Sequence, residues 1–417
     1  MKVSRERLQI IGKMIGILRE EKRQNKQNSW TQIRFCENIC SPNTLKSIES
    51  GKVGRSDAIY EQLLAKLDLK YGEFPVIDEA IQNIIDELYE AIEYFDKDRI
   101  NKLTNKALKV LEQVKMYIYY SELHDIMSDI NNYYVNISPI YVKKAEHYLE
   151  TMKLFPIEMR DILKLLIFAG VKLECTSNVE LYEQYVNKLD IKNTNLPCFK
   201  INLLHYYHIK NERFKIIELI KELEEVFIKE NNIIRLLGVY NAGLSSLSVI
   251  DNTLRDLYQK KVLNIIATHD IPIVQKSETY ANIAFGYYNQ HDYKDALGYL
   301  YKCIEDGCKD LLGSYLIIAD CQNHLNMHID VPELDKESLR KYSREIRSIY
   351  NYFLMYKGEE VPNTFKQKIL IKKIAPLLED EWIIEVFRFE LNKLVKETNS
   401  YKDLYLFEQI VKKNIDK

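Results

Sequence analysis

The chain has 417 residues, with 59 Lys and Arg against 61 Asp and Glu, and a formal net charge of −2. This length exceeds a single compact core, and the scarcity of Gly (13) and Pro (9) favours long helices over strands and loops. No apolar run reaches the roughly 18 residues of a membrane span, and charges throughout the first ten residues argue against a secretory signal. We therefore expect a cytoplasmic protein with no membrane partner.

The charge is distributed unevenly along the chain. The first 72 residues carry 14 Lys and Arg against 8 Asp and Glu, whereas the remainder carries 45 against 53. A small basic segment before an acidic body is typical of a DNA-binding domain joined to a regulatory domain. An imbalance of this size also arises by chance, so the charge alone does not decide the matter.

The first two predicted helices are separated by a polar stretch. Apolar residues at helical spacing predict a helix over 8–21 with one buried face. Residues 23–29 contain no apolar side chain and indicate a loop, with Ser29 as the cap of a second helix over 30–39. The side chains expected to face inward from this second helix are Trp30, Ile33, Phe35 or Cys36, and Ile39.

The third predicted helix, over 42–50, has the clearest boundaries. Ser41 is a favoured N-cap, Pro42 suits the first helical position, and Gly51 suits a left-handed C-cap. Its only apolar residues are Leu45 and Ile48. Two short helices joined by a turn, the second with a polar outer face, form a helix-turn-helix whose second helix can enter the DNA major groove.

A fourth helix is predicted over 56–67, with Ser56 as its cap. Tyr71-Gly72 and Phe74-Pro75 then interrupt the helical pattern. The sequence therefore predicts a DNA-binding domain at 1–72 and a second domain at 73–417.

The run from Thr31 to Ser41, followed by Leu45 and by Ile48-Glu49-Ser50-Gly51, resembles the Xre-type helix-turn-helix. It is most similar to the version in the PlcR and Rgg regulators, which belong to the RRNPP group of peptide-sensing transcription regulators in Gram-positive bacteria. The resemblance implies that Gln32 contacts a DNA phosphate from a helix N-terminus. It also implies a structural pair between Glu49 and Arg19.

The resemblance further implies which positions contact DNA. The third helix would read the bases, and the whole expected DNA-binding set is Gln32, Ser41, Pro42, Asn43, Thr44, Lys46 and Ser47. The stretch 23–29 departs from the family, which joins its first two helices by a shorter turn. It either reaches DNA phosphate through Arg23 and Lys26 or forms a solvated loop, and we favour the loop.

From Val76 onward, helical patterns of about 15–20 residues alternate with short breaks. Such helices are typical of antiparallel hairpins stacked in series. Residues 280–307 resemble a tetratricopeptide repeat, with Ala284 and Ala296 where the two helices approach. The expected fold is all-α, with a helix-turn-helix followed by a right-handed tetratricopeptide-type α-solenoid. The last helices, over 365–411, depart from the repeat pattern and are candidates for a cap or a dimer contact.

Three asparagines, Asn202, Asn241 and Asn282, recur 39 and 41 residues apart in similar surroundings. On inner helices of successive repeats they would face one concave groove, where each amide offers a donor and an acceptor to an extended peptide. In the resembled sensors, inner-helix asparagines do this. The alternative, in which these amides bond neighbouring turns of the scaffold, is equally open. The expected peptide-binding set is Asn202, Tyr206, Asn241, Asn282 and Phe285.

The motifs of common enzymes and metal proteins are missing from the sequence. There is no phosphate-binding glycine loop, no zinc motif of the His-Glu-x-x-His type, and no nucleophile beside a base. The pairs His205/His208 and His324/His328 have helical spacing, but no clustered Cys or carboxylate partners accompany them. Cys36 and Cys40 are interpreted as a buried pair of thiols in preference to a redox switch. We therefore expect no enzymatic activity, no cofactor and no metal.

Taken together, these patterns predict a homodimeric, sequence-specific transcription regulator. It would bind a palindromic operator in double-stranded DNA and respond to a short signalling peptide, as in quorum sensing. Such sensors control processes that include virulence and sporulation. The alternative is a protein-interaction adaptor whose repeat array docks a partner protein.

Overall fold

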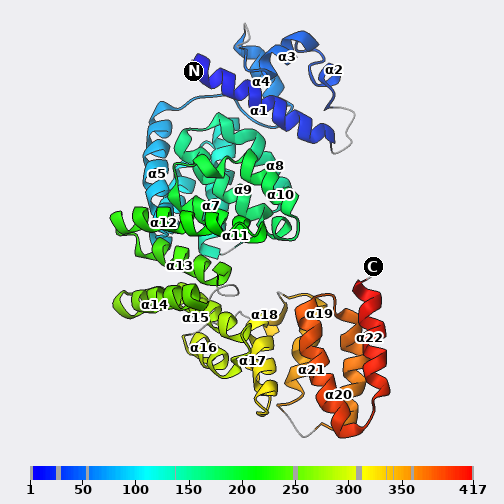
Figure 1. Ribbon diagram of the computed structural model, residues 1–417. Helices are drawn as coiled ribbons and strands as arrows, with labels where there is room; N and C mark the ends of the chain where they lie inside the picture. Colours follow the sequence, from blue (N-terminus) through cyan, green and yellow to red (C-terminus); the bar gives the residue numbers. More distant parts are fainter. Residues whose placement is uncertain are drawn as a thin grey trace. The chain divides into compact units, whose positions relative to one another are not determined.

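The computed structural model describes residues 3–24, 30–52, 56–136, 138–247, 252–306, 312–334, 336–340, 342–357 and 361–415. Over these ranges the chain is helical with no strand, and an isolated bridge joins Lys70 to Tyr117, which confirms the all-α class (Figure 1). The contacts divide the chain into two compact units, Met1–Val239 and Tyr240–Lys417, and each is described by itself. Within the described ranges, no helix is both long and apolar enough to cross a bilayer.

The first unit begins with four helices, and these are α1 (Arg5–Gln24), α2 (Gln32–Phe35), α3 (Pro42–Glu49) and α4 (Asp57–Ala65). Helix α1 packs against α3 and α4. Two glycines of α1 allow the close approach of α3, since a Cβ at Gly12 would overlap the carbonyl oxygen of Ile48, and one at Gly16 would lie 3.1 Å from the Cβ of Glu49. The mutual position of α1 and α3 therefore depends on residues without side chains.

The second helix differs from its prediction. It ends at Phe35 instead of Ile39, because Asn38 adopts a left-handed φ of 64° that interrupts the helix. Phe35 and Cys36 are buried as expected, whereas Ile33 is 71% exposed and was wrongly placed inward. The proposed cap, Ser29, lies outside the described residues. Ser56 precedes α4, but its side chain makes no capping hydrogen bond.

The remaining helices of the first unit pack mainly on their neighbours in sequence. Contacts join α5 to α6, α6 to α7, α8 to α9, and α11 to α12. Several turns between them contain left-handed asparagines, such as Asn211 and Asn231. The bounds are α5 (Pro75–Glu93), α6 (Lys97–Leu111), α7 (Ile118–Asn136), α8 (Val142–Thr151), α9 (Ile157–Ser177), α10 (Val179–Lys188), α11 (Pro197–Ile209), α12 (Arg213–Lys229) and α13 (Ile233–Leu247), the last of which runs into the second unit.

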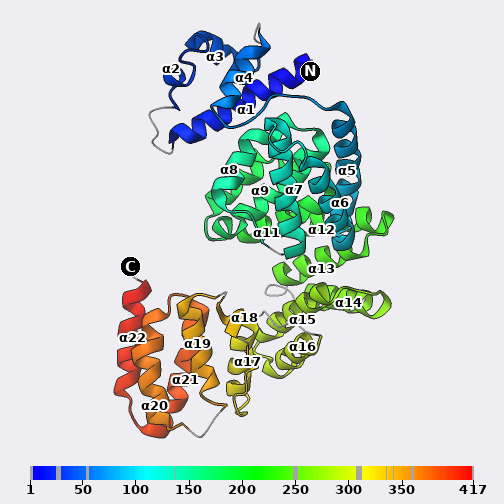
Figure 2. The same ribbon diagram turned by 180° about the vertical axis from the view of Figure 1, so that it is seen from behind.

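The second unit contains the helical hairpin that the sequence predicts most clearly, over residues 280–307. Helices α15 and α16 pack together, with Ala284 and Ala296 completely buried at their contact. One apolar core extends from this hairpin to the C-terminal helices, which Figure 2 shows side by side. The bounds are α14 (Asn252–Thr268), α15 (Ile273–Tyr288), α16 (Tyr293–Glu305), α17 (Leu312–His324), α18 (Lys336–Arg340), α19 (Arg344–Leu354), α20 (Asn363–Ile369), α21 (Glu381–Thr398) and α22 (Lys402–Ile415).

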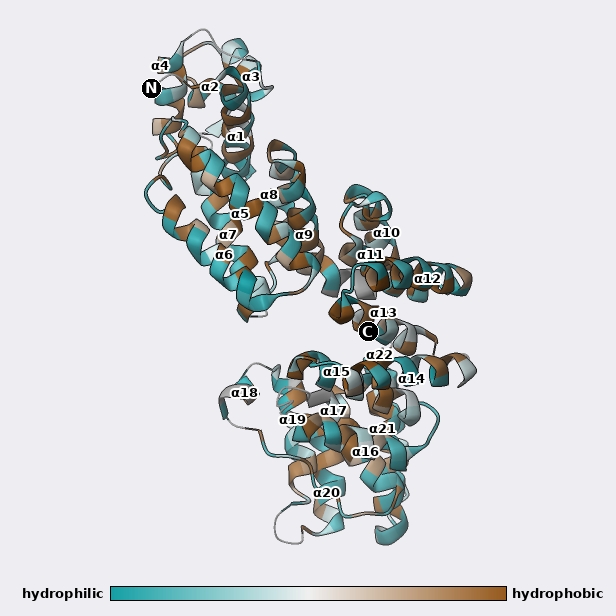
Figure 3. Ribbon diagram, turned by 90° about the vertical axis from the view of Figure 1, so that its left-hand side faces the viewer, coloured by the Kyte–Doolittle hydropathy of each residue, from teal (hydrophilic) through white to brown (hydrophobic). Residues whose placement is uncertain are grey.

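Most helices are amphipathic. Figure 3 shows brown apolar and teal polar stretches alternating along them, as expected when one face of a helix is buried. Because the core of each unit is built from such faces, the polar groups inside it are few.

Candidate functional site

Helix α3 is held by two apolar anchors and presents a polar outer face. Leu45 and Ile48 are completely buried. Ser41 is the N-cap, as predicted, since its Oγ accepts a hydrogen bond of 3.1 Å from the backbone N–H of Thr44. Gly51 adopts a φ of 82°, the left-handed conformation predicted for the end of the helix. The boundaries of α3 are therefore confirmed.

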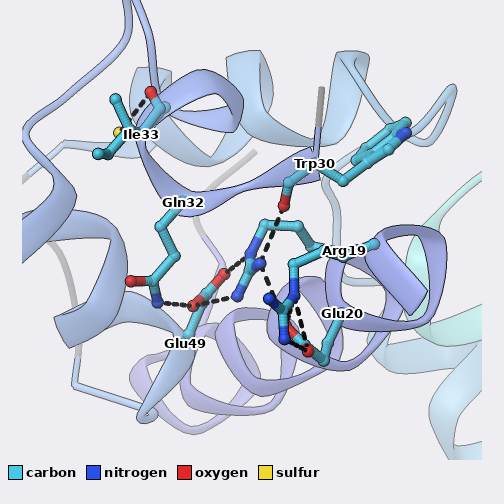
Figure 4. Close-up of polar contacts among 8 residues, drawn as sticks. Arg19, Glu20, Trp30, Gln32, Ile33 and Glu49 are labelled. Carbon is cyan, nitrogen blue, oxygen red and sulfur yellow. Dashed lines mark hydrogen bonds and ion pairs between the residues drawn. The ribbon is translucent and has the colours of Figure 1, made fainter. Parts of the chain in front are cut away.

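An ion-pair network joins α1, α2 and α3, and Figure 4 shows it. The Arg19 guanidinium donates from Nε to Glu49 Oε1 at 2.5 Å and from Nη2 to Glu49 Oε2 at 3.1 Å. Its Nη1 donates to the carbonyl oxygen of Trp30 at 3.0 Å. Arg19 is 5% exposed, so this pair is shielded from water. The pairing of Arg19 with Glu49 is thus present as expected and joins α1 to the end of α3, while the bond to the Trp30 carbonyl oxygen holds the segment before α2 against α1.

Gln32, the residue expected to contact phosphate, belongs to the same network. Its side-chain Nε2 donates to Glu49 Oε2 at 2.9 Å, which fixes the start of α2 against the end of α3. The amide nitrogen carries a second hydrogen, and the backbone N–H groups of the first helical turn have no partner within the helix. The site geometry therefore leaves donors at the beginning of α2 for an anion.

The remaining expected DNA-binding residues lie along α3. Four of them, Ser41, Pro42, Asn43 and Lys46, are exposed, and Thr44 and Ser47 are half-buried. The cations Arg34 and Lys52 are exposed close to them in sequence. Lys66, by contrast, donates to the Phe35 carbonyl oxygen at 2.8 Å and stabilises the end of α2, so its charge has a structural role.

The stretch 23–29 is described only at its beginning. Arg23 is exposed, and its Nε donates to Glu20 Oε1 at 2.9 Å within α1. The hydrogen bond that Arg23 donates to Glu20 raises the pKa of Arg23. Lys26 and the rest of the stretch lie outside the described residues, so both readings of this segment stay predictions.

The two cysteines of this region are free thiols. Cys36 is buried and its Sγ lies 3.5 Å from the carbonyl oxygen of Ile33. Burial is the main cause that raises the pKa of the Cys40 thiol, and the neighbouring Cys36 raises it too. A raised pKa lowers the thiolate fraction and with it the reactivity toward oxidants. This geometry favours the structural interpretation of the pair.

The three asparagines of the expected peptide site do not share one role. Asn202 on α11 donates to the Phe199 carbonyl oxygen at 3.1 Å, one turn back in its own helix. Asn241 on α13 is 7% exposed and donates to Thr279 Oγ1 of α15 at 2.8 Å. Asn282 is half-buried on α15. Asn202 lies in the first unit and the other two lie in the second. Within the second unit, the bond from Asn241 to Thr279 joins α13 to α15, the helix that carries Asn282.

The two aromatic residues of that expected site are also placed differently. Tyr206 is 3% exposed, and its ring packs edge-on against Tyr182 at 5.4 Å. It is therefore a packing residue, and its placement on a ligand-facing surface was wrong. Phe285 is exposed on α15, one turn from Asn282.

Buried polar atoms without hydrogen-bond partners gather on α13, α14 and α15. Within the described part of these three helices, the atoms are Asn241 Oδ1, Arg255 Nη1, Gln259 Oε1, Gln275 Oε1 and Ser277 Oγ. Three of them are amide oxygens, and a buried amide oxygen without a donor is uncommon and costly unless a ligand supplies the donor. Gln259 and Gln275 were not predicted as site residues, since single glutamines in helices are ordinary surface residues.

Three histidines of the two pairs make contacts with other rings. The rings of His205 and His208 are stacked with centroids 6.4 Å apart, and burial lowers the pKa of His205. His324 is stacked between Tyr293 and Phe389. In the described ranges, no group of three or more His, Cys, Asp or Glu side chains is arranged to hold a metal ion.

Comparison of this chain with protein-family models, with curated proteins and with solved structures produced no match in any of the three. Its function must therefore be inferred from its own residues.

Proposed function

We propose that this chain is a sequence-specific DNA-binding transcription regulator of the RRNPP type, in which α2 and α3 form the helix-turn-helix. The observation that carries the proposal is the outer face of α3. It bears Asn43, Thr44, Lys46 and Ser47, and the buried Arg19–Glu49 pair fixes it to α1. A helix that is rigidly held and polar outside, with few anchors, suits insertion into a major groove.

In this proposal the protein acts as a homodimer in the cytoplasm of a Gram-positive bacterium. Two α3 helices would read the half-sites of a palindromic operator, since half-site symmetry mirrors dimer symmetry. Gln32 would bind a backbone phosphate, and the α3 residues would contact base edges. The repeat helices, arranged as a tetratricopeptide-type array, would bind a short signalling peptide.

Replacing Lys46 with alanine is expected to weaken binding to the selected operator by about 1–3 kcal/mol, roughly 5–150-fold. The reason is that Lys46 is exposed at the centre of the outer face of α3. The measurement is fluorescence anisotropy with DNA obtained by selection from a random pool. Lys109→Ala, which removes an exposed lysine from α6, serves as the control and should leave the affinity unchanged.

The same assay tests the alternative of an adaptor. If the chain binds DNA, the logarithm of the affinity falls linearly with the logarithm of the salt concentration, because released counterions drive binding. If no sequence is enriched from the pool and Lys46→Ala behaves like Lys109→Ala, the DNA-binding proposal fails. The adaptor in which the repeats dock a partner protein would then be the better account.

The peptide site is proposed at α13 and α15, because Asn241 Oδ1 and Gln275 Oε1 are buried there without donors. Replacing both Asn241 and Asn282 with alanine is expected to abolish enrichment of peptides from a displayed random library by the full-length chain. Asn202→Ala, which removes an amide that bonds its own helix, is the matched control and should keep the enrichment. Equal enrichment by the unsubstituted chain, the double variant and Asn202→Ala would contradict a peptide site at α13 and α15.

A further inference from the structure

The second unit contains a cavity of about 550 Å³ near the ends of α15 and α17 and the beginning of α21. Its walls are mainly aromatic. The lining includes Tyr288, Tyr293, Asp320, His324, Trp382 and Phe389. None of these residues belongs to the peptide site proposed above, so the cavity needs a separate explanation.

Asp320 is the central polar group of this cavity. The residue is 2% exposed, and its Oδ2 accepts a hydrogen bond of 2.6 Å from the Tyr288 hydroxyl. The other oxygen, Oδ1, makes no hydrogen bond with any described residue. His324 Nε2 lies 3.7 Å from Oδ1, which is too long for a hydrogen bond. A buried carboxylate oxygen without a donor is a costly arrangement unless a ligand supplies one.

The charge states of Asp320 and His324 favour a cationic partner for Asp320 other than the imidazole. Burial raises the pKa of Asp320, and this outweighs the hydrogen bond from Tyr288, which lowers it. Burial also lowers the pKa of His324, which disfavours an imidazolium as the partner of Asp320. A bound positive charge beside Oδ1 would offset the desolvation of the carboxylate.

The aromatic walls are arranged in fixed contacts. The Trp382 ring lies edge-on to Tyr288 at 6.1 Å, and its Nε1 donates to the Tyr288 hydroxyl at 3.1 Å. The Tyr293 ring is parallel to the His324 ring at 4.1 Å. Aromatic faces attract cations through their quadrupoles, most strongly when the cation is shielded from water. An aromatic lining of this kind suits an organic cation wherever a ring face borders the cavity.

The charged residues of the lining reinforce this preference. Glu381 and Glu385 are exposed at the start of α21, and no Lys or Arg belongs to the cavity lining. Glu385 is paired with Arg388, whereas the Glu381 side chain accepts no hydrogen bond from the described residues. The lining offers too few oxygen ligands in one place for a calcium or magnesium ion.

We propose that this cavity binds the N–H-bearing cationic group of an organic ligand, a primary ammonium or a guanidinium. Asp320 Oδ1 accepts its hydrogen bond, and Tyr288 and Trp382 form the walls around it. Such a group belongs either to a basic side chain of a peptide or to a free polyamine. The proposal depends neither on DNA binding nor on the peptide site at α13 and α15.

The test uses the full chain with Trp30→Phe, because the sequence has two tryptophans and Trp382 then becomes the sole reporter. The probes are n-butylammonium, n-butylguanidinium and the neutral n-butanol. A saturable change in Trp382 fluorescence is expected with the two cations, at least tenfold tighter than with n-butanol. Asp320→Asn should raise the Kd for the cations at least tenfold, whereas Glu305→Gln, an exposed carboxylate at the end of α16, should leave it unchanged.

The comparison of cation with alcohol needs no substitution in the cavity, so it remains decisive if Asp320→Asn fails to fold. Glu381→Gln, at the exposed edge of the cavity, provides a second variant and should raise the Kd for the cations two- to threefold. Equal responses to n-butylammonium and n-butanol, or a folded Asp320→Asn with unchanged Kd, would overturn the proposal. Parallel titrations with Gly-Lys-Gly and with spermidine identify the source, since the tighter of the two shows whether a peptide or a polyamine supplies the cation.

Discussion

Replacing Arg19 with alanine is expected to lower the free energy of unfolding of the four N-terminal helices by about 3–5 kcal/mol. The Arg19 and Glu49 side chains are 6% and 10% exposed, so the substitution leaves a carboxylate shielded from water without its ion-pair partner. It also removes the donor to the Trp30 carbonyl oxygen. The measurement is urea denaturation in a Trp382→Phe background, with Trp30 fluorescence as a local reporter, since its ring lies 5.5 Å from Phe35.

The chain offers a matched control for this prediction. Arg23 lies on the same helix and also binds a glutamate, but its pair with Glu20 is in solvent. Arg23→Ala should therefore leave the urea midpoint unchanged, because exposed pairs are screened and contribute little. DNA binding should be lost in Arg19→Ala and retained in Arg23→Ala. If both substitutions have the same effect on stability, the network does not hold α2 and α3 in place.

The third helix was predictable because its signals are local. Ser41 and Pro42 mark its start through backbone chemistry that acts over three residues, and Gly51 marks its end through its freedom to adopt positive φ. The two apolar residues Leu45 and Ile48 can face only one way, since they are three positions apart on a helix. Each of these signals is independent of the rest of the fold.

The second helix was not predictable to the same degree. Trp30 and Ile33 suggest a longer amphipathic helix, but Asn38 takes a left-handed conformation and the turn into α3 begins after Phe35. Lys66, 31 residues from Phe35 in the sequence, stabilises the helix end by binding its carbonyl oxygens. Such a contact depends on tertiary structure, which a local pattern does not contain.

The partners of the repeated asparagines likewise depend on tertiary structure and could not be predicted from a local pattern. Asn202 and Asn241 occupy similar sequence surroundings, yet one bonds the preceding turn of its own helix and the other bonds Thr279 on a different helix. The choice between these partners is set by which neighbouring helix is near. Asp320 was not recognised because a single aspartate in an apolar helix has no sequence signature, and only its burial distinguishes it.

His147, on α8, connects α1 to α7 within the first unit. Its Nδ1 lies 2.5 Å from Glu21 Oε1 on α1, and its Nε2 lies 2.7 Å from Glu122 Oε1 on α7. Because both acceptors are carboxylates, both ring nitrogens must donate, and the ring is an imidazolium. A cavity of about 700 Å³, lined by residues of α1, α8 and α10, adjoins this contact. His147 therefore borders open space on one side. We expect a displacement of α7 or α8 to change the position of α1 through the two hydrogen bonds of this residue.

The second large effect is a pH dependence of the free energy of unfolding that arises from His147. Burial alone would lower the pKa of His147, but the hydrogen bonds and charges of Glu122 and Glu21 raise it to about 10. The unfolded state binds this proton with a pKa near 6.5, so the stabilisation is fully present below about pH 6.5 and is lost as the pH rises to about 10. We expect a loss of about 3–4 kcal/mol over this interval, reduced from the full linkage value because Glu21 is one-third exposed.

His147→Gln should remove this pH dependence, because glutamine cannot carry the charge. The measurement is the free energy of unfolding between pH 6 and 10, taken as the difference between the variant and the unsubstituted chain so that other titrating groups cancel. His124→Gln, on α7, is the control, since that ring is one-quarter exposed and lies 3.4 Å from an exposed carboxylate on Glu112. Hydrogen exchange should quicken in α1 and α8 of His147→Gln alone. An unchanged pH profile in His147→Gln would show that the imidazolium does not join these helices, and other contacts of α1, such as the Arg7–Asp78 pair at 2.9 Å, would then hold α1 in place.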